Sequence, residues 1–487
     1  MPGGASLPPW GQTERQRVYN ALLAVPYQLE RLLWFGGGVC ADAWGSVFTA
    51  LPLRCVGAAG RAARSLAAAM TGAPRPPWPS AGADLYDGAC AAIFGCAAAA
   101  LCAVPGGALY FWMKDLTQEF LKLHVIYTAI EIGDRIGCSF TVDALDALAG
   151  TCAQVAAAPD RPTRARLLPS LAADSLLAGL LVTSHGLVLM CHGMALAVAM
   201  HSTRGHTLVA LTIAANFVEL KGTVFKRYDG AKLFGLAAQD VVERFHLALA
   251  LAFVLVEAAA AGSGNASASA TAAAAGGGGA GSAESLLASA SSSFTSIAPV
   301  LLRRCAQVLG AELAIDLIKH AVVCKFNDVR PGMYREFFKD VCEAVVEGSG
   351  GEDGLSGRGG GGEAGGGLPA GGDHQAAGPP TATSTRHGFQ PQAGSRLLVF
   401  DPLAAAAFTV RIGVGWAAGR GGAGAAGTLA GRLAAAAWWA GAFGLALVAK
   451  VALGFVLRTA AQGYLGRYAR VHGVGGVRVG GGGLKRE

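Results

Sequence analysis

Apolar stretches close to about 20 residues long recur along this chain of 487 residues. A helix of about that length is what crosses the hydrocarbon core of a bilayer. Only 15% of the residues are charged, where a soluble protein carries about 25%, and the mean hydropathy is +0.43. The sequence therefore predicts an all-α, polytopic membrane protein. The alternative is a soluble Ala-rich helical repeat protein, but no repeat with a period of roughly 33–47 residues is found.

The apolar stretches predict about six to eight membrane helices, joined to amphipathic helices at the membrane surface. Residues 14–31 form the first amphipathic segment, and Pro105 with Gly106 is expected to kink the second apolar stretch. Residues 171–200 are long enough for one tilted span and too short for two. The candidate spans are residues 32–51, 87–113, 171–200, 247–261, 297–325, 397–416 and 429–457.

Low-complexity sequence divides the chain into parts. Stretches rich in Gly, or in Gly, Ala and Ser, cannot build a packed core, so we expect them to be disordered. Residues 57–83 and 156–169 are expected to be Pro-containing loops. The expected parts are a disordered N-terminus (1–13), a membrane core (14–345) with a low-complexity insertion (258–296), a Gly-rich disordered linker (346–394), C-terminal membrane helices (395–460) and a basic Gly-rich tail (461–487).

Basic residues are distributed unevenly among the segments between the spans. Cytosolic loops of membrane proteins carry an excess of Lys and Arg. This rule places residues 203–246, residues 324–396 and the C-terminal tail in the cytosol, and residues 258–296 in the lumen. Lys and Arg number six in 203–246, none in 258–296, seven in 324–396 and six in 458–487.

Two further features bear on this topology. Asn265 begins an Asn-Ala-Ser glycosylation sequon in the segment that is placed in the lumen. With 171–200 as a single span, residues 114–170 also fall in the lumen, although they contain six Lys and Arg. Either a charged helix at 121–148 re-enters the membrane, or the number of spans differs by one.

Three charged segments lie between the apolar stretches, at residues 121–148, 216–228 and 310–328. In the middle segment, apolar residues recur at helical spacing, and Glu219 and Lys221 occupy other faces of the helix. A dense charged helix between spans is either a docking surface for a partner or a solvated helix face. Both interpretations of Glu219 and Lys221 stay open.

The last charged segment carries Glu312, Asp316, Lys319 and His320 on one face of a helix. A charged side chain at the centre of a membrane helix costs about 2.5–3.5 kcal/mol on insertion scales, so we expect these groups to be paired. Three interpretations stay open: pairing within the protein, docking of another helix, and a pathway for a proton or an ion.

The first charged segment contains Glu131, Asp134 and Arg135. Glu131 and Arg135 are four residues apart and can pair along one helix face. We expect an internal ion pair, either among these three residues or with the polar face at 312–320.

Two histidines seven residues apart lie on one face of an apolar stretch. His185 and His192, with Met190, Cys191 and Met194 nearby, have the composition of a soft-metal site. A histidine that is hydrogen-bonded inside a helix bundle is far more common, so we expect no metal here. The eleven cysteines contain no C-x-x-C pair, which argues against a zinc site and against a disulfide framework.

The sequence lacks the motifs that indicate an enzyme. A G-x-G-x-x-G match at 419–424 follows no predicted strand, and there is no P-loop, H-E-x-x-H or G-x-S-x-G. The net charge of +7 fits basic cytosolic loops rather than nucleic-acid binding. Residues 1–14 do not have the pattern of a cleavable signal peptide. We therefore expect no catalytic activity, no cofactor and no nucleic-acid partner.

Five segments follow one another in an order that resembles the transmembrane anterior posterior transformation family of eukaryotic multipass membrane proteins. Glu131, Asp134 and Arg135 fit the E-x-x-D-R pattern of that family. The Ala- and Gly-rich segments 258–293 and 348–394 depart from it and are interpreted as insertions. The segments are E-R-Q-R-V-Y (14–19), F-T-A-L-P-L-R (48–54), K-L-H-V-I-Y with E-I-G-D-R and D-A-L-D-A-L (122–148), N-F-V-E-L-K-G-T-V-F-K-R (216–227) and E-L-A-I-D-L-I-K-H-A with K-F-N-D (312–328).

The resemblance implies a multipass protein of the endoplasmic reticulum membrane without catalytic activity. Fungal members look like partners of a SUN-domain-like membrane protein, in a complex that protects folding lumenal proteins. Animal members are linked to cilium formation, which implies the ciliary basal body as a second location, and to axial and skeletal patterning. The expected function is a scaffold that lies in the lipid bilayer and binds another integral membrane protein. The alternative is an ion or small-solute transporter or channel.

Overall fold

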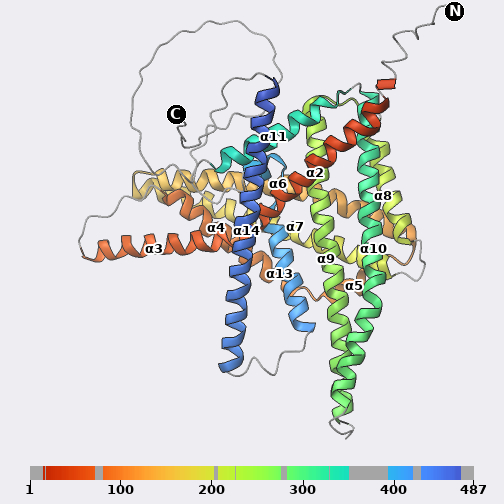
Figure 1. Cartoon of the computed structure of the whole chain (residues 1–487). Helices are drawn as coiled ribbons and strands as arrows, with labels where there is room; N and C mark the ends of the chain where they lie inside the picture. The colour runs from red at the N-terminus through yellow and green to blue at the C-terminus, as the bar shows by residue number, and fades with distance from the viewer. Residues whose placement is uncertain are drawn as a thin grey trace, which may run out of the picture.

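The structure is a computed structural model of the chain (Figure 1). Every regular element in the part that it describes is helical, which confirms the all-α class. The described residues are 15–16, 18–71, 80–201, 207–224, 226–275, 282–327, 329–349, 393–419 and 429–472.

The helices differ widely in length, and the longest exceed the thickness of a bilayer. In chain order they are a π-helical turn η1 (Asn20–Ala24), α2 (Val25–Phe48), α3 (Ala50–Thr71), α4 (Ala81–Ala103), α5 (Gly106–Leu116), α6 (Phe120–Ala157), α7 (Arg161–His201), α8 (Thr207–Val224), α9 (Gly230–Ala275), α10 (Ser282–Phe326), α11 (Gly332–Ser349), α12 (Ala393–Leu397), α13 (Pro402–Gly419) and α14 (Leu429–His472).

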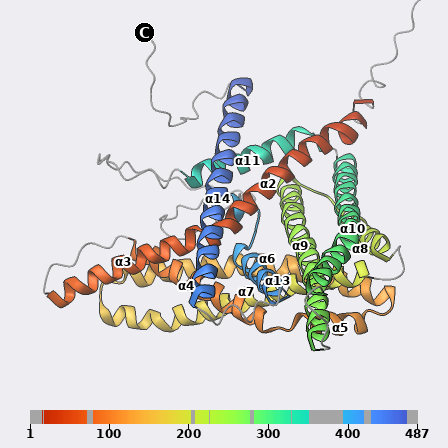
Figure 2. The same cartoon turned by 60° about the horizontal axis from the view of Figure 1, so that its bottom comes forward.

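The helices run in two main directions. α6 and α7 lie side by side across the molecule, whereas α9 and α10 lie side by side at a steep angle to them (Figures 1 and 2). Helix α14 also runs steeply to α7 in these views and packs on α2 and α11. Helix α9 belongs to both apolar cores. Its Leu247 and Phe253 pack into a core with α4, α6, α7 and α13, and its Leu233 and Val241 pack into a second core with α2, α11 and α14. The position of α9 therefore links the two halves of the structure.

Helix α11 shows how the chain separates an apolar face from a polar face. Tyr334, Phe338 and Val341 are buried at helical spacing, against α2 and α14. Glu336 and Asp340 are exposed on the opposite side. The helix therefore covers the second core and presents acidic groups outward.

Three helices in the described part of the chain are long and apolar enough to cross a membrane: Ala81–Ala103, Arg161–Met200 and Phe443–Val471. This is fewer than the six to eight that the sequence predicts. Charged residues interrupt several of the other candidates, and the apolar helix Pro402–Val414 is short. The multipass membrane class therefore stands, and the larger number of spans remains a prediction.

The chain is more helical than its low-complexity composition predicts. The expected loop at 57–83 is helical as far as Thr71, and the expected linker at 156–169 contains the start of α7, with Pro169 inside the helix. The expected disordered insertion at 258–296 lies in α9 up to Ala275 and in α10 from Ser282. Ala has the highest helix propensity of all residues, which explains why these Ala-rich stretches continue helices.

The glycine-rich segments predicted to be disordered lie mostly outside the residues that the structure describes. Residues 1–13 and most of the linker at 346–394 lie outside the described residues, whereas the expected tail is helical up to His472. The kink expected at Pro105 and Gly106 is confirmed as a break: α4 ends at Ala103 and α5 begins at Gly106. Proline cannot donate the backbone hydrogen bond that would continue the helix.

Close packing of α4 on α6 leads to a first prediction. A Cβ atom at Gly82 would lie 3.2 Å from the Cα of Ala153 and 3.2 Å from the Cβ of Ala156, whereas a Cβ at Gly88 on the same helix would have no neighbour within 4 Å. We expect Gly82→Leu to lower the free energy of unfolding by about 1–3 kcal/mol through overpacking, measured by unfolding in detergent. Gly88→Leu is the matched control and should cause no loss; equal losses would contradict this packing.

Candidate functional site

Helix α9 carries polar side chains on two neighbouring faces in the middle of the protein. Asp240 and Arg244, four residues apart, point toward α10. Glu243 and His246, three residues apart, point toward α6. The two faces contribute to two separate buried polar groups.

We call the first group the lysine cluster: Asp240, Arg244, Asp316, Lys319 and His320. The Lys319 side chain is 1% exposed, and its Nζ donates to Asp240 Oδ1 at 2.7 Å and lies 3.0 Å from Asp316 Oδ1. His320 Nε2 lies 2.6 Å from Asp240 Oδ2. A fully buried ammonium group is therefore shared between carboxylates of α9 and α10.

Arg244 extends the lysine cluster to α2. Its Nε donates to Asp316 Oδ2 at 2.8 Å, and its two terminal nitrogens donate to the two carboxylate oxygens of Glu30 at 3.2 and 2.9 Å. A two-bonded arginine–carboxylate contact has fixed geometry as well as strength. The cluster therefore joins α2, α9 and α10 at one point.

The surroundings set the ionisation states in this cluster. Burial by itself would raise the pKa of Asp240, but Lys319 and His320 outweigh it and lower this pKa to about 2. Burial raises the pKa of Tyr334 well above its ordinary value, so its phenol stays protonated. The Tyr334 hydroxyl lies 2.7 Å from His320 Nδ1 and can donate to it. His320 is thereby held between a donor and a carboxylate.

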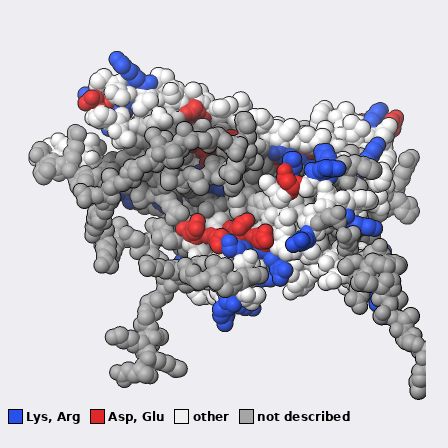
Figure 3. All heavy atoms as spheres, turned by 90° about the horizontal axis from the view of Figure 1, so that it is seen from above, with Lys and Arg blue, Asp and Glu red and all other residues white. Residues whose placement is uncertain are grey.

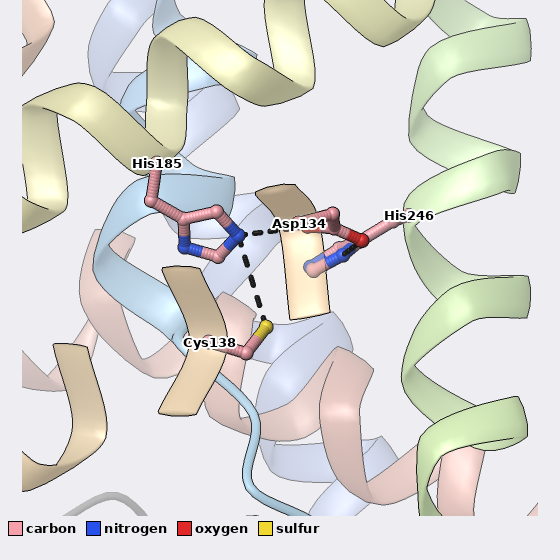
Figure 4. A group of neighbouring side chains, drawn as sticks. All are labelled: Asp134, Cys138, His185 and His246. Atoms are coloured by element: carbon pink, nitrogen blue, oxygen red, sulfur yellow. Dashed lines mark hydrogen bonds and ion pairs between the residues drawn. The ribbon is translucent and has the colours of Figure 1, made fainter. Parts of the chain in front are cut away.

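We call the second group the histidine cluster: Asp134, Cys138, His185 and His246, shown in Figure 4, together with Asp401, which contacts His185. The two oxygens of Asp134 lie 2.8 Å from His185 Nε2 and 2.9 Å from His246 Nδ1. Cys138 Sγ lies 3.7 Å from the same His185 nitrogen. The side chains come from α6, α7, α9 and the start of α13, and all five residues are buried.

Asp401 fixes the other side of the His185 ring. Its Oδ2 lies 2.9 Å from His185 Nδ1, and its Oδ1 accepts hydrogen bonds from the backbone N–H groups of Leu403 and Ala404. Asp401 thus caps the N-terminus of α13. Asp401 lies within the candidate span 397–416 and is not among the predicted site residues, and the structure gives it this role.

A cavity of about 220 Å³ adjoins the histidine cluster. Val399 is part of its wall and has a φ of 54°, the sole non-glycine residue with positive φ among the residues described. This conformation is strained for a β-branched side chain, and such strain is often found at functional sites. The cavity is lined by Glu131, Asp134, Arg135, Cys138, His192, Gly235, Ala238, Gln239, Val242, Glu243 and residues 397–399.

The residues predicted from the first charged segment lie around this cavity. Arg135 pairs with Glu243 at 3.1 Å, Asp134 belongs to the histidine cluster, and Glu131 lines the cavity wall. Arg135 thus pairs with Glu243 of α9, which is neither one of the three residues of this segment nor part of the polar face at 312–320, and which the sequence does not single out.

The other predicted residues fall into two groups. Asp316, Lys319 and His320 come together in the lysine cluster, and Glu312 is buried one turn earlier on the same helix. In contrast, Lys221 is exposed on α8. The side chains of Glu219, also on α8, and Asn265, within α9, lie outside those that the structure describes.

The histidine cluster offers a donor set that can coordinate a metal. One ligand atom each from Asp134, Cys138, His185 and His246 lies within 4.8 Å of the others. His192, the other histidine of the sequence pattern, instead has its Nε2 3.1 Å from the hydroxyl of Tyr127. His185 pairs with Cys138, Asp134 and Asp401, which lie 47, 51 and 216 positions away, and such pairing leaves no local signal in the sequence.

The fold and these buried clusters define an all-helical membrane protein with a polar interior. The chain belongs to the eukaryotic membrane protein family, whose pattern matches residues 81–465, and its relatives identify this as the transmembrane anterior posterior transformation family. The resemblance found in the five sequence segments is thereby confirmed. No solved structure matches the chain.

The relatives include proteins of a plant and of animals. Protein POLLEN DEFECTIVE IN GUIDANCE 1 of Arabidopsis thaliana is 27% identical over 351 residues, which cover 71% of this chain and 49% of the relative. Transmembrane anterior posterior transformation protein 1 of Mus musculus is 29% identical over 323 residues, covering 66% and 50%. The TAPT1 homolog of Caenorhabditis elegans is 29% identical, covering 69% and 40%. The chain thus spans about half the length of these relatives or less.

The lysine cluster leads to a second prediction. Lys319→Met keeps the aliphatic stem but removes the cation that Asp240 and Asp316 share. Loss of one partner from a buried ion pair costs about 3–5 kcal/mol, because the other charge stays buried. We expect a loss of that size in the free energy of unfolding in detergent.

The half-exposed pair of Lys339 and Glu343, 3.0 Å apart on α11, provides the control. Lys339→Met should cost only about 0–1 kcal/mol, because water screens this pair. Equal losses in the free energy of unfolding for Lys319→Met and Lys339→Met would contradict a stabilising role of the lysine cluster.

Proposed function

We propose that this chain is a noncatalytic multipass scaffold of the endoplasmic reticulum membrane that assembles with another integral membrane protein. Family membership supports the membrane class. The compartment, a SUN-like partner and a role in protein folding or cilium-related development follow from the family resemblance. The names of the Arabidopsis thaliana and Mus musculus relatives refer to pollen guidance and to anterior posterior transformation. Both fit a general cellular role with developmental consequences.

The observation that carries this proposal is the internal pairing of the buried charges. Lys319 is shared between Asp240 and Asp316, and Arg244 bonds both Asp316 and Glu30. Charges that neutralise one another across three helices fix the helices in place. A transport pathway needs polar groups that exchange partners with a moving ion, and these groups are already occupied by one another.

Exposed charge supplies the surface for a partner. Lys221 in the last turn of α8, and Lys226 and Arg227 after the helix, are exposed in the segment that the sequence marks as a docking candidate. On the face shown in Figure 3, basic side chains form several groups, and acidic side chains form one larger patch, with basic side chains beside it, and several smaller ones. Such a pattern of charges can favour one orientation of an approaching partner.

One observation favours the alternative of a transporter or channel. The cavity beside the histidine cluster is lined by Glu131, Arg135 and Glu243, and charged groups around a cavity can bind an ion or a small solute. A flux assay on the purified protein in vesicles separates this alternative from the scaffold.

Affinity purification of the full chain from native membranes in a mild detergent gives a third prediction. We expect a membrane protein to co-elute in stoichiometric amount. Reversal of charge by Lys221→Glu with Arg227→Glu should reduce that recovery at least about tenfold, since like charges across an interface cost several kcal/mol. The measurement is quantitative mass spectrometry of the eluate.

The matched control reverses two basic residues that are exposed elsewhere, Arg467 and Arg470 on α14, with Arg467→Glu and Arg470→Glu. The control should keep the partner. A chain that elutes without a partner but supports ion flux in vesicles would overturn the scaffold in favour of the transporter.

A further inference from the structure

We propose that Asp134, Cys138, His185 and His246 form a binding site for one divalent transition-metal ion, with zinc as the ion that this donor set favours. The four ligand atoms lie within 4.8 Å of one another. Two imidazoles, a thiolate and a carboxylate are the donors that zinc takes in its four-coordinate sites, and harder ions such as magnesium prefer oxygen alone.

The local structure brings the four donors to one point. Asp134 and Cys138 are four residues apart on α6, so they share a helix face. His185 comes from α7 and His246 from α9, and both point at that face (Figure 4). Glycine at position 137 permits this approach, since a Cβ there would lie 2.8 Å from the His185 ring. The site therefore depends on three helices, the consecutive α6 and α7 and the later α9.

One of the donor distances is close to the value expected around a bound zinc ion, and two are shorter. Cys138 Sγ and His185 Nε2 are 3.7 Å apart, and two such ligands on a tetrahedral zinc lie about 3.6 Å apart. The contacts of Asp134 with the histidines, 2.8 and 2.9 Å, are shorter than the roughly 3.4 Å that zinc would impose. An ion between these donors would replace the two Asp134 contacts, so the carboxylate and the two rings would move apart on binding.

Asp401 is the positioning residue of this site. Metal-binding histidines almost always give their second ring nitrogen to a carboxylate or carbonyl, which sets the tautomer and the ring orientation. His185 Nδ1 lies 2.9 Å from Asp401 Oδ2, which leaves Nε2 facing the other three donors. The backbone amides of α13 hold Asp401 in turn.

The adjoining cavity gives the ion a route to the site. Asp134 and Cys138 form part of its wall, and the carboxyl groups of Glu131 and Glu243 line it as well. Acidic groups along such a route raise the local concentration of cations. The site is thus buried and also accessible from the cavity.

The test begins with the metal content of the full chain, purified in mild detergent without a polyhistidine tag and without chelator. We expect about one zinc per chain by elemental mass spectrometry. Cobalt(II) in place of zinc should give the visible absorption of a tetrahedral site and a thiolate-to-cobalt band in the near ultraviolet. Cys138→Ser should abolish the thiolate band, and His246→Gln should abolish stoichiometric zinc.

Cys152→Ser is the matched control, because Cys152 is a buried cysteine of the same helix that lies in the apolar core. It should keep both the zinc and the thiolate band. Monodisperse elution in detergent shows that each variant is folded. Wild-type protein without zinc and without tetrahedral cobalt absorption would overturn the proposal, as would a thiolate band that persists in Cys138→Ser.

Asp401→Asn tests the positioning role separately. Asparagine caps a helix as well as aspartate does, so α13 should stay intact. We expect zinc affinity to fall about 10- to 100-fold, measured by competition with a chelator of known affinity. Unchanged zinc affinity would contradict a positioning role of Asp401. A loss of thermal stability in the zinc-free variant would show that Asp401 has a structural role instead.

Discussion

The buried contact between Lys319 and Asp240 is the interaction on which the other features depend. It fixes α10 against α9, and Arg244, one turn further along α9, fixes the same pair of helices to α2. Removal of either partner would leave a charge without compensation in a place that water does not reach. The contact therefore specifies one arrangement of these helices among those that apolar packing would allow.

Helix α9 shows why polar contacts are needed to fix one arrangement of the helices. Apolar side chains of α9 pack into both cores, so apolar burial alone sets its rotation only weakly. Asp240 must face α10 while Glu243 and His246 face α6, and a rotation of the helix by one residue would break every one of these contacts. Buried polar pairs can fix helix register in this way. The cavity, the histidine cluster and the strained Val399 are positioned by that register.

The sequence predicts the class of fold and half of the polar interior. Composition and apolar stretches give an all-helical membrane protein, and helical spacing correctly groups Asp316, Lys319 and His320. It does not give Asp240 as their partner, because the two elements are about 80 positions apart. It also underestimates helix in Ala-rich segments, since Ala and Gly together suggest low complexity while Ala alone favours helix. The histidine cluster cannot be predicted from helical spacing, because its four donor side chains come from three helices and only Asp134 and Cys138 share one of them.

The two clusters compensate the negative charge of their buried carboxylates in different ways. In the lysine cluster, Asp240, Asp316 and Glu30 face the cationic side chains of Lys319 and Arg244. In the histidine cluster, Asp134 and Asp401 face imidazole rings and a thiol, and His185 carries charge there only when both of its ring nitrogens are protonated. A divalent ion held by nitrogen and sulfur would supply that charge at the point where the donors converge. The same physical requirement thus leads to an internal ion pair on one face of α9 and to a metal site on the other.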